Sequence, residues 1–297
     1  MSTIAAAPAA TTFASSDRRV GGFLVLTFAL SWGSWLIALL LGGDLSSPAV
    51  FAFYAIGGFG PSLAAVVYRL RGVRSPRVPR PGRLALWLPA AIGLGAAPAV
   101  LAATLGPLVG APALGIADIT ASFADSGLLP FLLIATMAGP LSEEFGWRGY
   151  VQPRLRARLS PLATAGVLGT IWALWHVPLF LLTGTSQSSL GAVEAVGFLA
   201  CMVPMSLTYW FISERLRGGV PAAVVMHYAG NVSLSLLPFT ALTGGLIFAA
   251  TVLVTAGVLV AVPAVGARTS RRALGAERSG TQVGAAVTGT GRRSRGV

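Results

Sequence analysis

The hydrophobic positions of this 297-residue chain fall into eight long apolar runs, separated by shorter segments that are richer in glycine, proline and charge. Roughly 20 apolar residues in a helix are needed to cross the hydrocarbon core of a bilayer, and each run is close to that length. The pattern therefore predicts an all-α, polytopic membrane protein with about eight transmembrane helices. The predicted spans are residues 20–41, 48–68, 84–110, 127–147, 161–184, 190–212, 220–238 and 243–265.

The overall composition excludes a soluble enzyme. Hydrophobic residues make up 55% of the chain and charged residues only 10%, whereas a water-facing domain carries about 25% charged residues. A single cysteine excludes a disulfide scaffold and a cluster of thiolate metal ligands. The net charge of +12 would indicate nucleic acid in a soluble protein. Here it is interpreted as a topology signal and as contact with anionic lipid headgroups, and no nucleic-acid partner is expected.

The positions of the basic residues predict the orientation in the membrane. With eight spans, all 21 arginines fall on one side, and the opposite loops hold Asp44, Asp118 and Asp125 without a basic residue. Because basic loops stay on the cytoplasmic side, we expect a protein of the cell membrane with both termini in the cytoplasm. Residues 1–19 then form a cytoplasmic N-terminal segment, and residues 266–297 form a basic, disordered cytoplasmic tail.

Few ionisable side chains lie within the predicted spans, and the presence of each one there needs a structural or functional explanation. A charge at mid-membrane costs at least about 2.5–3.5 kcal/mol. The intramembrane polar residues of interest are Glu143, Glu144, Arg148, His176, Glu194, His227 and Asn231. They include both histidines of the chain, which makes this set the main candidate for a functional site. Glu194 lies near the outer end of its span and is assigned no role, and serines within spans, such as Ser62, are expected to bond to their own helix.

The spacing of these residues predicts which of them share a helix face. Arg148 follows Glu144 by four residues, one helical turn, so the two can form an ion pair. Glu143 points about 100° away from Glu144 and is left free for other contacts.

Two further pairs have the same one-turn spacing. Trp172 lies one turn before His176, and His227 lies one turn before Asn231. Three helices could therefore bring Glu143 and both histidines together in a cavity that faces the cytoplasm.

Such a set of side chains favours the activation of water. A glutamate can act as a general base while one imidazole shares the proton or orients the water. A second imidazole and an amide can hold the oxyanion that forms when water attacks a carbonyl. Alternatively, Glu143, His176 and His227 could bind zinc and leave a position open for water. Both readings lead to hydrolysis of an amide or ester, and the sequence leaves zinc and metal-free chemistry equally open.

Three short motifs resemble a known family. Residues 143–148 read EEFGWR, residues 172–176 read WALWH, and residues 227–231 read HYAGN. In this order they resemble the CPBP family of intramembrane endopeptidases, which includes CAAX prenyl proteases of the Rce1 type and bacteriocin-immunity proteins. The family pattern is EExxxR, FxxxH and HxxxN, so Trp172 stands where the family has phenylalanine. The motifs lie within about a third of the chain and are specific only as a set.

The resemblance implies roles for individual residues. Glu143 and His176 would activate water, and His227 and Asn231 would stabilise the oxyanion. The supporting residues would be Glu144, Arg148 and Trp172.

The resemblance also implies an organisation of the chain and a function. The helices of residues 20–126, with a basic loop at 69–83, would precede a four-helix catalytic core at 127–238 and a last helix at 239–265. The expected function is intramembrane endopeptidase activity on a peptide or membrane-protein substrate at a cytoplasm-facing site. The alternatives are a proton-coupled transporter and a non-catalytic immunity or scaffold protein in the membrane. Neither prenylation of the substrate nor the oligomeric state is indicated.

Overall fold

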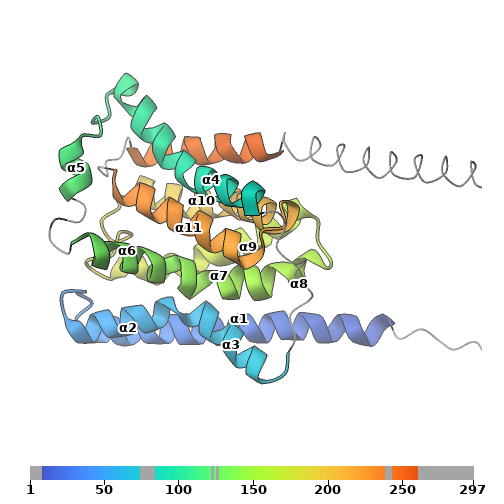
Figure 1. Cartoon of the computed structure of the whole chain (residues 1–297). Coiled ribbons are helices and arrows are strands. Elements are labelled where there is room, and N and C mark those ends of the chain that lie inside the picture. The colour runs from blue at the N-terminus through green and yellow to red at the C-terminus, as the bar shows by residue number, and fades with distance from the viewer. Residues whose placement is uncertain (1–8, 74–83, 122–123, 125–126, 238–242, 260–297) are drawn as a thin grey trace, which may run out of the picture. The chain divides into compact units, whose positions relative to one another are not determined.

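The computed structural model of the chain describes residues 9–73, 84–121, 124, 127–237 and 243–259. Within these residues the structure is helical, and its only bridge of strand type joins Asp44 to Thr183 (Figure 1). The predicted all-α class is confirmed. The helices are α1 (Ala9–Leu40), α2 (Pro48–Gly58), α3 (Gly60–Leu70), α4 (Leu84–Leu105), η1 (Gly106–Val109), α5 (Ile116–Ala121), α6 (Leu128–Thr136), η2 (Met137–Leu141), α7 (Ser142–Gly146), η3 (Trp147–Val151), α8 (Gln152–Arg156), α9 (Pro161–His176), η4 (Val177–Leu181), α10 (Ala192–Trp210), η5 (Phe211–Arg215), α11 (Gly219–Ser235) and a final helix, Thr243–Leu259.

Each of the eight apolar runs coincides with helical structure. Five helical segments of the described chain are long and apolar enough to cross a membrane, and the bent pair of α2 and α3 makes a sixth. The chain is therefore a multi-pass membrane protein. The last two runs correspond to α11 and to the apolar helix Thr243–Leu259, each only 17 residues long, so the count of eight spans stays a prediction.

The structure corrects several predicted boundaries. Helix α1 begins at Ala9, before the predicted span, whereas its apolar part, Arg19–Leu40, agrees with the predicted span of residues 20–41. The second span is broken by a 53° bend between α2 and α3, where Pro61 lacks the N–H that a continuous helix would use. The predicted tail at 266–297 and residues 74–83 of the basic loop lie outside the described residues.

The correction that matters most for the site concerns the fourth span. Its prediction ends at residue 147, whereas the helical segment continues to Arg156. Glu143 and Glu144 therefore lie well inside this segment, with helical chain on both sides of them.

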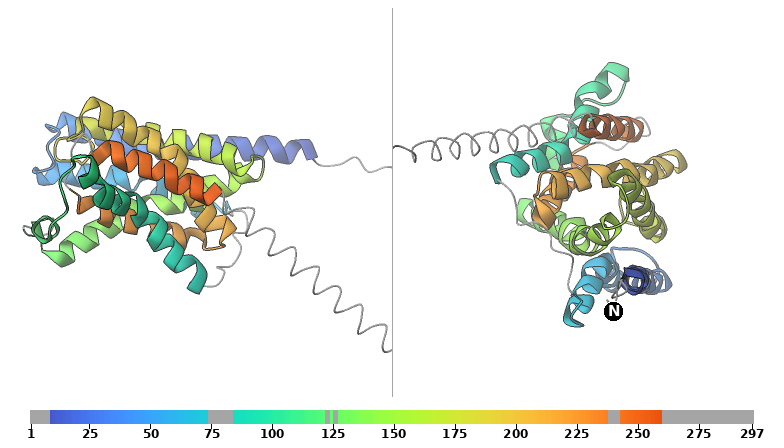
Figure 2. Two further views of the ribbon diagram at one scale, coloured as in Figure 1. Left: turned by 90° about the horizontal axis from the view of Figure 1, so that it is seen from above. Right: turned by 90° about the vertical axis from the view of Figure 1, so that its right-hand side faces the viewer.

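The helices pack as a bundle, and the right-hand view of Figure 2 shows many of them nearly end-on, so their axes are roughly aligned. Helix α11 packs along α4, α10 packs along α9, and α3 packs against α7. Many large apolar side chains point outward, whereas charged side chains such as Glu144 and Arg148 are fully buried. This distribution fits a lipid environment, in which charged groups face the interior of the bundle.

Candidate active site

The chain leaves regular helical geometry for one turn immediately before the two glutamates. This turn is η2, a π-helical segment in which Ala138 has ψ 93° and Gly139 has φ 106° and ψ −73°. Pro140 follows and has no N–H to donate. Backbone groups that leave a helix at membrane depth must find other partners, because lipid offers none.

Side chains from three helices supply those partners. On α7, the Ser142 hydroxyl accepts a hydrogen bond from the Gly139 N–H at 2.9 Å. On α11, the Asn231 amide donates to the Ala138 carbonyl oxygen at 2.9 Å. The irregular turn is thus bonded both to α7, which it precedes, and to α11.

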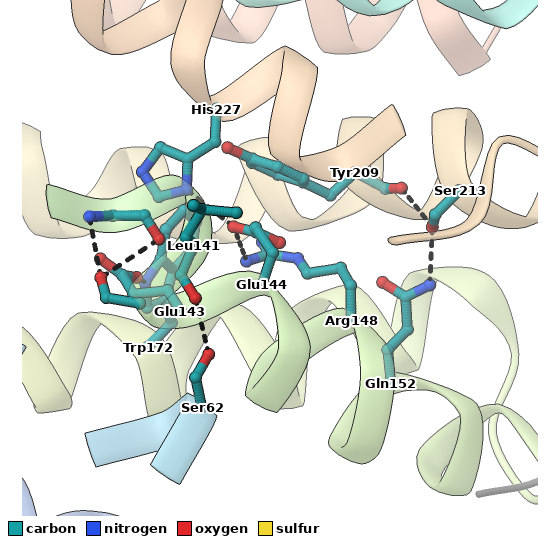
Figure 3. Close-up of polar contacts among 12 residues, drawn as sticks. Ser62, Leu141, Glu143, Glu144, Arg148, Gln152, Trp172, Tyr209, Ser213 and His227 are labelled. Carbon is teal, nitrogen blue, oxygen red and sulfur yellow. Dashed lines mark hydrogen bonds and ion pairs between the residues drawn. The ribbon is translucent and has the colours of Figure 1, made fainter. Parts of the chain in front are cut away.

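A third hydrogen bond reaches this turn from the N-terminal helices. The hydroxyl of Ser62 on α3 donates to the carbonyl oxygen of Leu141 at 2.9 Å (Figure 3). The expectation that Ser62 bonds to its own helix is therefore wrong. Helix α3 supports the segment from which Glu143 and Glu144 project.

Glu143 contacts the second motif directly. Its Oε2 accepts a hydrogen bond of 2.6 Å from the indole N–H of Trp172 on α9, and its side chain is buried. Glu143 was predicted to be free for contacts away from Glu144. In the structure it bonds to Trp172, the first aromatic residue of the WALWH motif. The rings of Trp172 and His176 also pack side by side, tilted by 60° with 5.7 Å between their centroids, as their spacing predicts.

The imidazole of His176 is held in one orientation by its own helix. Its Nδ1 lies 2.7 Å from the carbonyl oxygen of Trp172. A carbonyl oxygen accepts only, so Nδ1 carries the proton, and in the neutral ring Nε2 keeps a free lone pair.

Glu144 connects the first motif to the third. Its Oε1 accepts from Arg148 at 3.1 Å, which is the ion pair expected from the one-turn spacing. The same oxygen lies 2.7 Å from Nδ1 of His227 on α11. This second contact was not predicted, because helical spacing within one segment carries no information about a partner on another helix.

Arg148 is enclosed by aromatic rings. Its guanidinium carbon lies 4.3 Å from the ring centroid of Trp172 and 3.8 Å from that of Tyr209 on α10. A cation over an aromatic face is stabilised by the ring quadrupole. Tyr209 belongs to none of the three motifs, and the sequence analysis missed it.

The three motifs therefore meet in the interior of the bundle (Figure 3). The ring of His227 lies 6.0 Å from that of Trp172, so α7, α9 and α11 contribute to one cluster. A cavity of about 40 Å³ adjoins it and is lined by apolar residues together with Tyr209, His227 and Asn231. This volume is large enough to hold a water molecule.

The predicted metal-ligand set does not converge on one point. Among the described residues, no group of three or more His, Cys, Asp and Glu side chains is arranged to hold a metal ion. Oε2 of Glu143 is bonded to the indole of Trp172, and the Nδ1 atoms of His176 and His227 are bonded to protein oxygens. As arranged, these donors do not fit a metal ion.

The region that contains this cluster is similar to known proteins. The family model of the type II CAAX prenyl endopeptidases, Rce1-like, matches residues 125–265. A CAAX prenyl protease 2 of Methanococcus maripaludis is 27% identical over 115 residues, which cover 38% of this chain and 42% of that protein. The chain thus matches less than half the length of this relative.

The matched region contains all three motifs and every residue of the buried cluster except Ser62, which supports it from α3. Residues 125–265 are therefore similar to the Rce1-like CAAX prenyl endopeptidases, in agreement with the resemblance of the three motifs to the CPBP family.

Proposed function

We propose that this protein is an intramembrane endopeptidase that hydrolyses a peptide bond with a water molecule activated by Glu143. The observation that carries the proposal is the convergence of the three motifs. Glu143 bonds to Trp172 at 2.6 Å, and Glu144 lies 2.7 Å from His227. The match to a protease family favours hydrolysis over proton-coupled transport or a scaffold role.

The charges of the cluster support this chemistry. Glu143, Glu144 and Arg148 are buried together, so two carboxylates face one guanidinium. One further proton, on Glu143 or on His227, makes the cluster neutral, and buried charges are tolerated when they are balanced in this way. In the proposed reaction this proton is on His227, so that Glu143 is ionised and can accept a proton from water.

In the first step, ionised Glu143 accepts a proton from water while the water oxygen bonds to the carbonyl carbon of the scissile peptide. His176 orients the water through its free Nε2, since its Nδ1 donates to the carbonyl of Trp172. The carbonyl π-bond electrons move to oxygen and form an oxyanion. His227, protonated on both ring nitrogens so that Nδ1 stays bonded to Glu144, donates a hydrogen bond to this oxyanion through Nε2, as does the second N–H of the Asn231 amide.

In the second step the oxyanion re-forms the carbonyl and the C–N bond breaks. Glu143 passes its proton to the leaving nitrogen, so the products are a carboxylic acid and an amine and Glu143 is again ionised. Glu144 holds the His227 ring by its Nδ1, and Arg148 keeps Glu144 paired. Glu144 and Arg148 thus orient the oxyanion donor without touching the substrate.

The proposed substrate is a peptide or membrane protein that reaches the site from the inner leaflet. The relative's name, CAAX prenyl protease 2, makes a prenylated C-terminal peptide the first substrate to test. From the arginine distribution we also propose that the protein lies in the cell membrane with both termini in the cytoplasm and its basic segments near anionic headgroups.

The test uses the purified full chain in liposomes with two peptides of one sequence, one farnesylated at its C-terminal cysteine and one unmodified. Glu143→Gln keeps the shape of the side chain but removes the base, and we expect it to abolish cleavage. Glu194→Gln is the matched control, because Glu194 lies in the first turn of α10, outside the cluster. Cleavage by Glu143→Gln at the wild-type rate would contradict the proposal. The two peptides decide whether the prenyl group is required.

A further inference from the structure

Tyr209 is a buried polar side chain that none of the steps above uses. It lies on α10 and is 1% exposed, and its ring stands between Arg148 and His227 (Figure 3). Its hydroxyl makes no hydrogen bond within the described part of the chain. An enclosed hydroxyl that has no protein partner is available to bind a ligand.

The ring of Tyr209 is held rigidly. One face lies 3.8 Å from the guanidinium carbon of Arg148. The ring also makes edge contacts with Trp172 at 5.7 Å and with His227 at 6.0 Å between centroids. Because the ring is already fixed, the hydroxyl loses little side-chain entropy when it bonds to a ligand.

The hydroxyl is located where a reacting carbonyl would be bound. Tyr209, His227 and Asn231 line the same small cavity, and Figure 3 shows the hydroxyl end of the ring turned toward His227. The other polar side chains that line this cavity are Thr208 and Thr251, and their hydroxyls bond to carbonyl oxygens of their own helices. Tyr209 is therefore the lining hydroxyl that remains available.

We propose that the Tyr209 hydroxyl donates a hydrogen bond to the oxyanion of the tetrahedral intermediate, as a third donor beside His227 and Asn231. The proposal rests on the proposed endopeptidase function. The phenol keeps its proton throughout, so no bond is broken at Tyr209 and the balance of the two steps is unchanged. Because the oxyanion exists only after water attacks, this contact stabilises the transition state more than the bound substrate.

The first test is Tyr209→Phe, which keeps the ring on Arg148 and removes only the hydroxyl. We expect kcat to fall about 100-fold, the usual loss for one oxyanion donor, while KM and the thermal stability stay at their wild-type values. The matched control is Tyr150→Phe. Tyr150 also stacks on an arginine, Arg154 at 3.5 Å, but its hydroxyl donates to the carbonyl of Arg19 outside the cluster. This control should keep the wild-type kcat.

The outcomes separate this proposal from the function on which it rests. Wild-type kcat in Tyr209→Phe, with Glu143→Gln inactive, would overturn the role of Tyr209 and leave the endopeptidase proposal standing. A change in KM alone would overturn it as well, because the hydroxyl would then bind the ground state. An inactive wild-type protein would contradict both proposals.

A second measurement does not depend on how well the phenylalanine variant folds. Fluorotyrosine at position 209 keeps the shape of the side chain but makes the phenol more acidic. If the hydroxyl must carry its proton, the high-pH limb of the kcat profile should move to lower pH in the fluorinated protein. An unmoved limb would contradict the proposal.

Discussion

Adding one methyl group at Gly139 should disable the site, because the backbone there passes directly against the third motif. A Cβ on Gly139 would lie 2.6 Å from Nε2 of His227 and 3.0 Å from Nδ2 of Asn231. The first distance is 0.8 Å short of the 3.4 Å at which ordinary contact begins. Gly139 also has φ 106°, which side chains rarely adopt.

The size of the effect follows from these two features. The backbone conformation costs an alanine about 1–3 kcal/mol, and overpacking of a full interior costs about 1–3 kcal/mol more. We therefore expect Gly139→Ala to lower the free energy of unfolding by about 2–6 kcal/mol. A displacement of His227 approaching 1 Å should lower kcat about 100-fold in the protein that remains folded.

The assay combines denaturant unfolding in mixed micelles, followed by tryptophan fluorescence, with peptide cleavage in liposomes. The matched control is Gly166→Ala on α9, where an added Cβ meets no atom within 4 Å. In a helix interior this change should stabilise the protein by up to about 1 kcal/mol and leave kcat unchanged. A Gly139→Ala protein with wild-type stability and rate would refute the assigned geometry of η2.

Three further substitutions test the supporting contacts. Ser62→Ala removes the donor to the Leu141 carbonyl; it should lower the free energy of unfolding by about 1–3 kcal/mol and reduce kcat, and unchanged values in both assays would argue against support from α3. Glu144→Ala leaves the buried Arg148 unpaired; denaturant unfolding should show a loss of about 3–5 kcal/mol, together with loss of cleavage, and a stable, active variant would speak against the pair. Glu214→Ala removes an acceptor of three side-chain N–H groups, and Glu214 does not line the cavity; stability should fall by about 1–3 kcal/mol while the cleavage rate of folded protein is kept, and a lost rate would extend the site to this region.

Much of the helical architecture could be predicted from the sequence, because lipid requires long apolar runs and permits few charges. Within the described residues the eight runs overlap helices, and the Glu144–Arg148 pair and the Trp172–His176 ring contact follow from one-turn spacing. These features depend only on the geometry of a single helix. The number of spans is less certain from composition, since α11 is only 17 residues long.

The contacts between helices could not be predicted in the same way. Glu144 meets His227, and Tyr209 covers Arg148, only because of how α7, α10 and α11 are rotated about their axes. A one-turn spacing predicts which residues share a helix face, but it does not predict which neighbouring helix packs against that face.

The irregular turn before the glutamates did leave a signal in the sequence. Gly139-Pro140 stands inside an apolar run, where glycine and proline both weaken a helix. Such a pair at membrane depth marks a place where the backbone needs side-chain partners, and Ser62 was a possible donor. Its assignment to its own helix followed the commoner pattern for intramembrane serines.

If Glu143 activates water in this buried cluster, the oxygen of that water must appear in the product. This can be measured by cleavage with the full chain in water enriched in ¹⁸O, followed by mass spectrometry of the newly formed C-terminal carboxylate. We expect one ¹⁸O atom in that carboxylate for the wild type and no product from Glu143→Gln. A product without ¹⁸O, or labelled product formed equally well by Glu143→Gln, would contradict it.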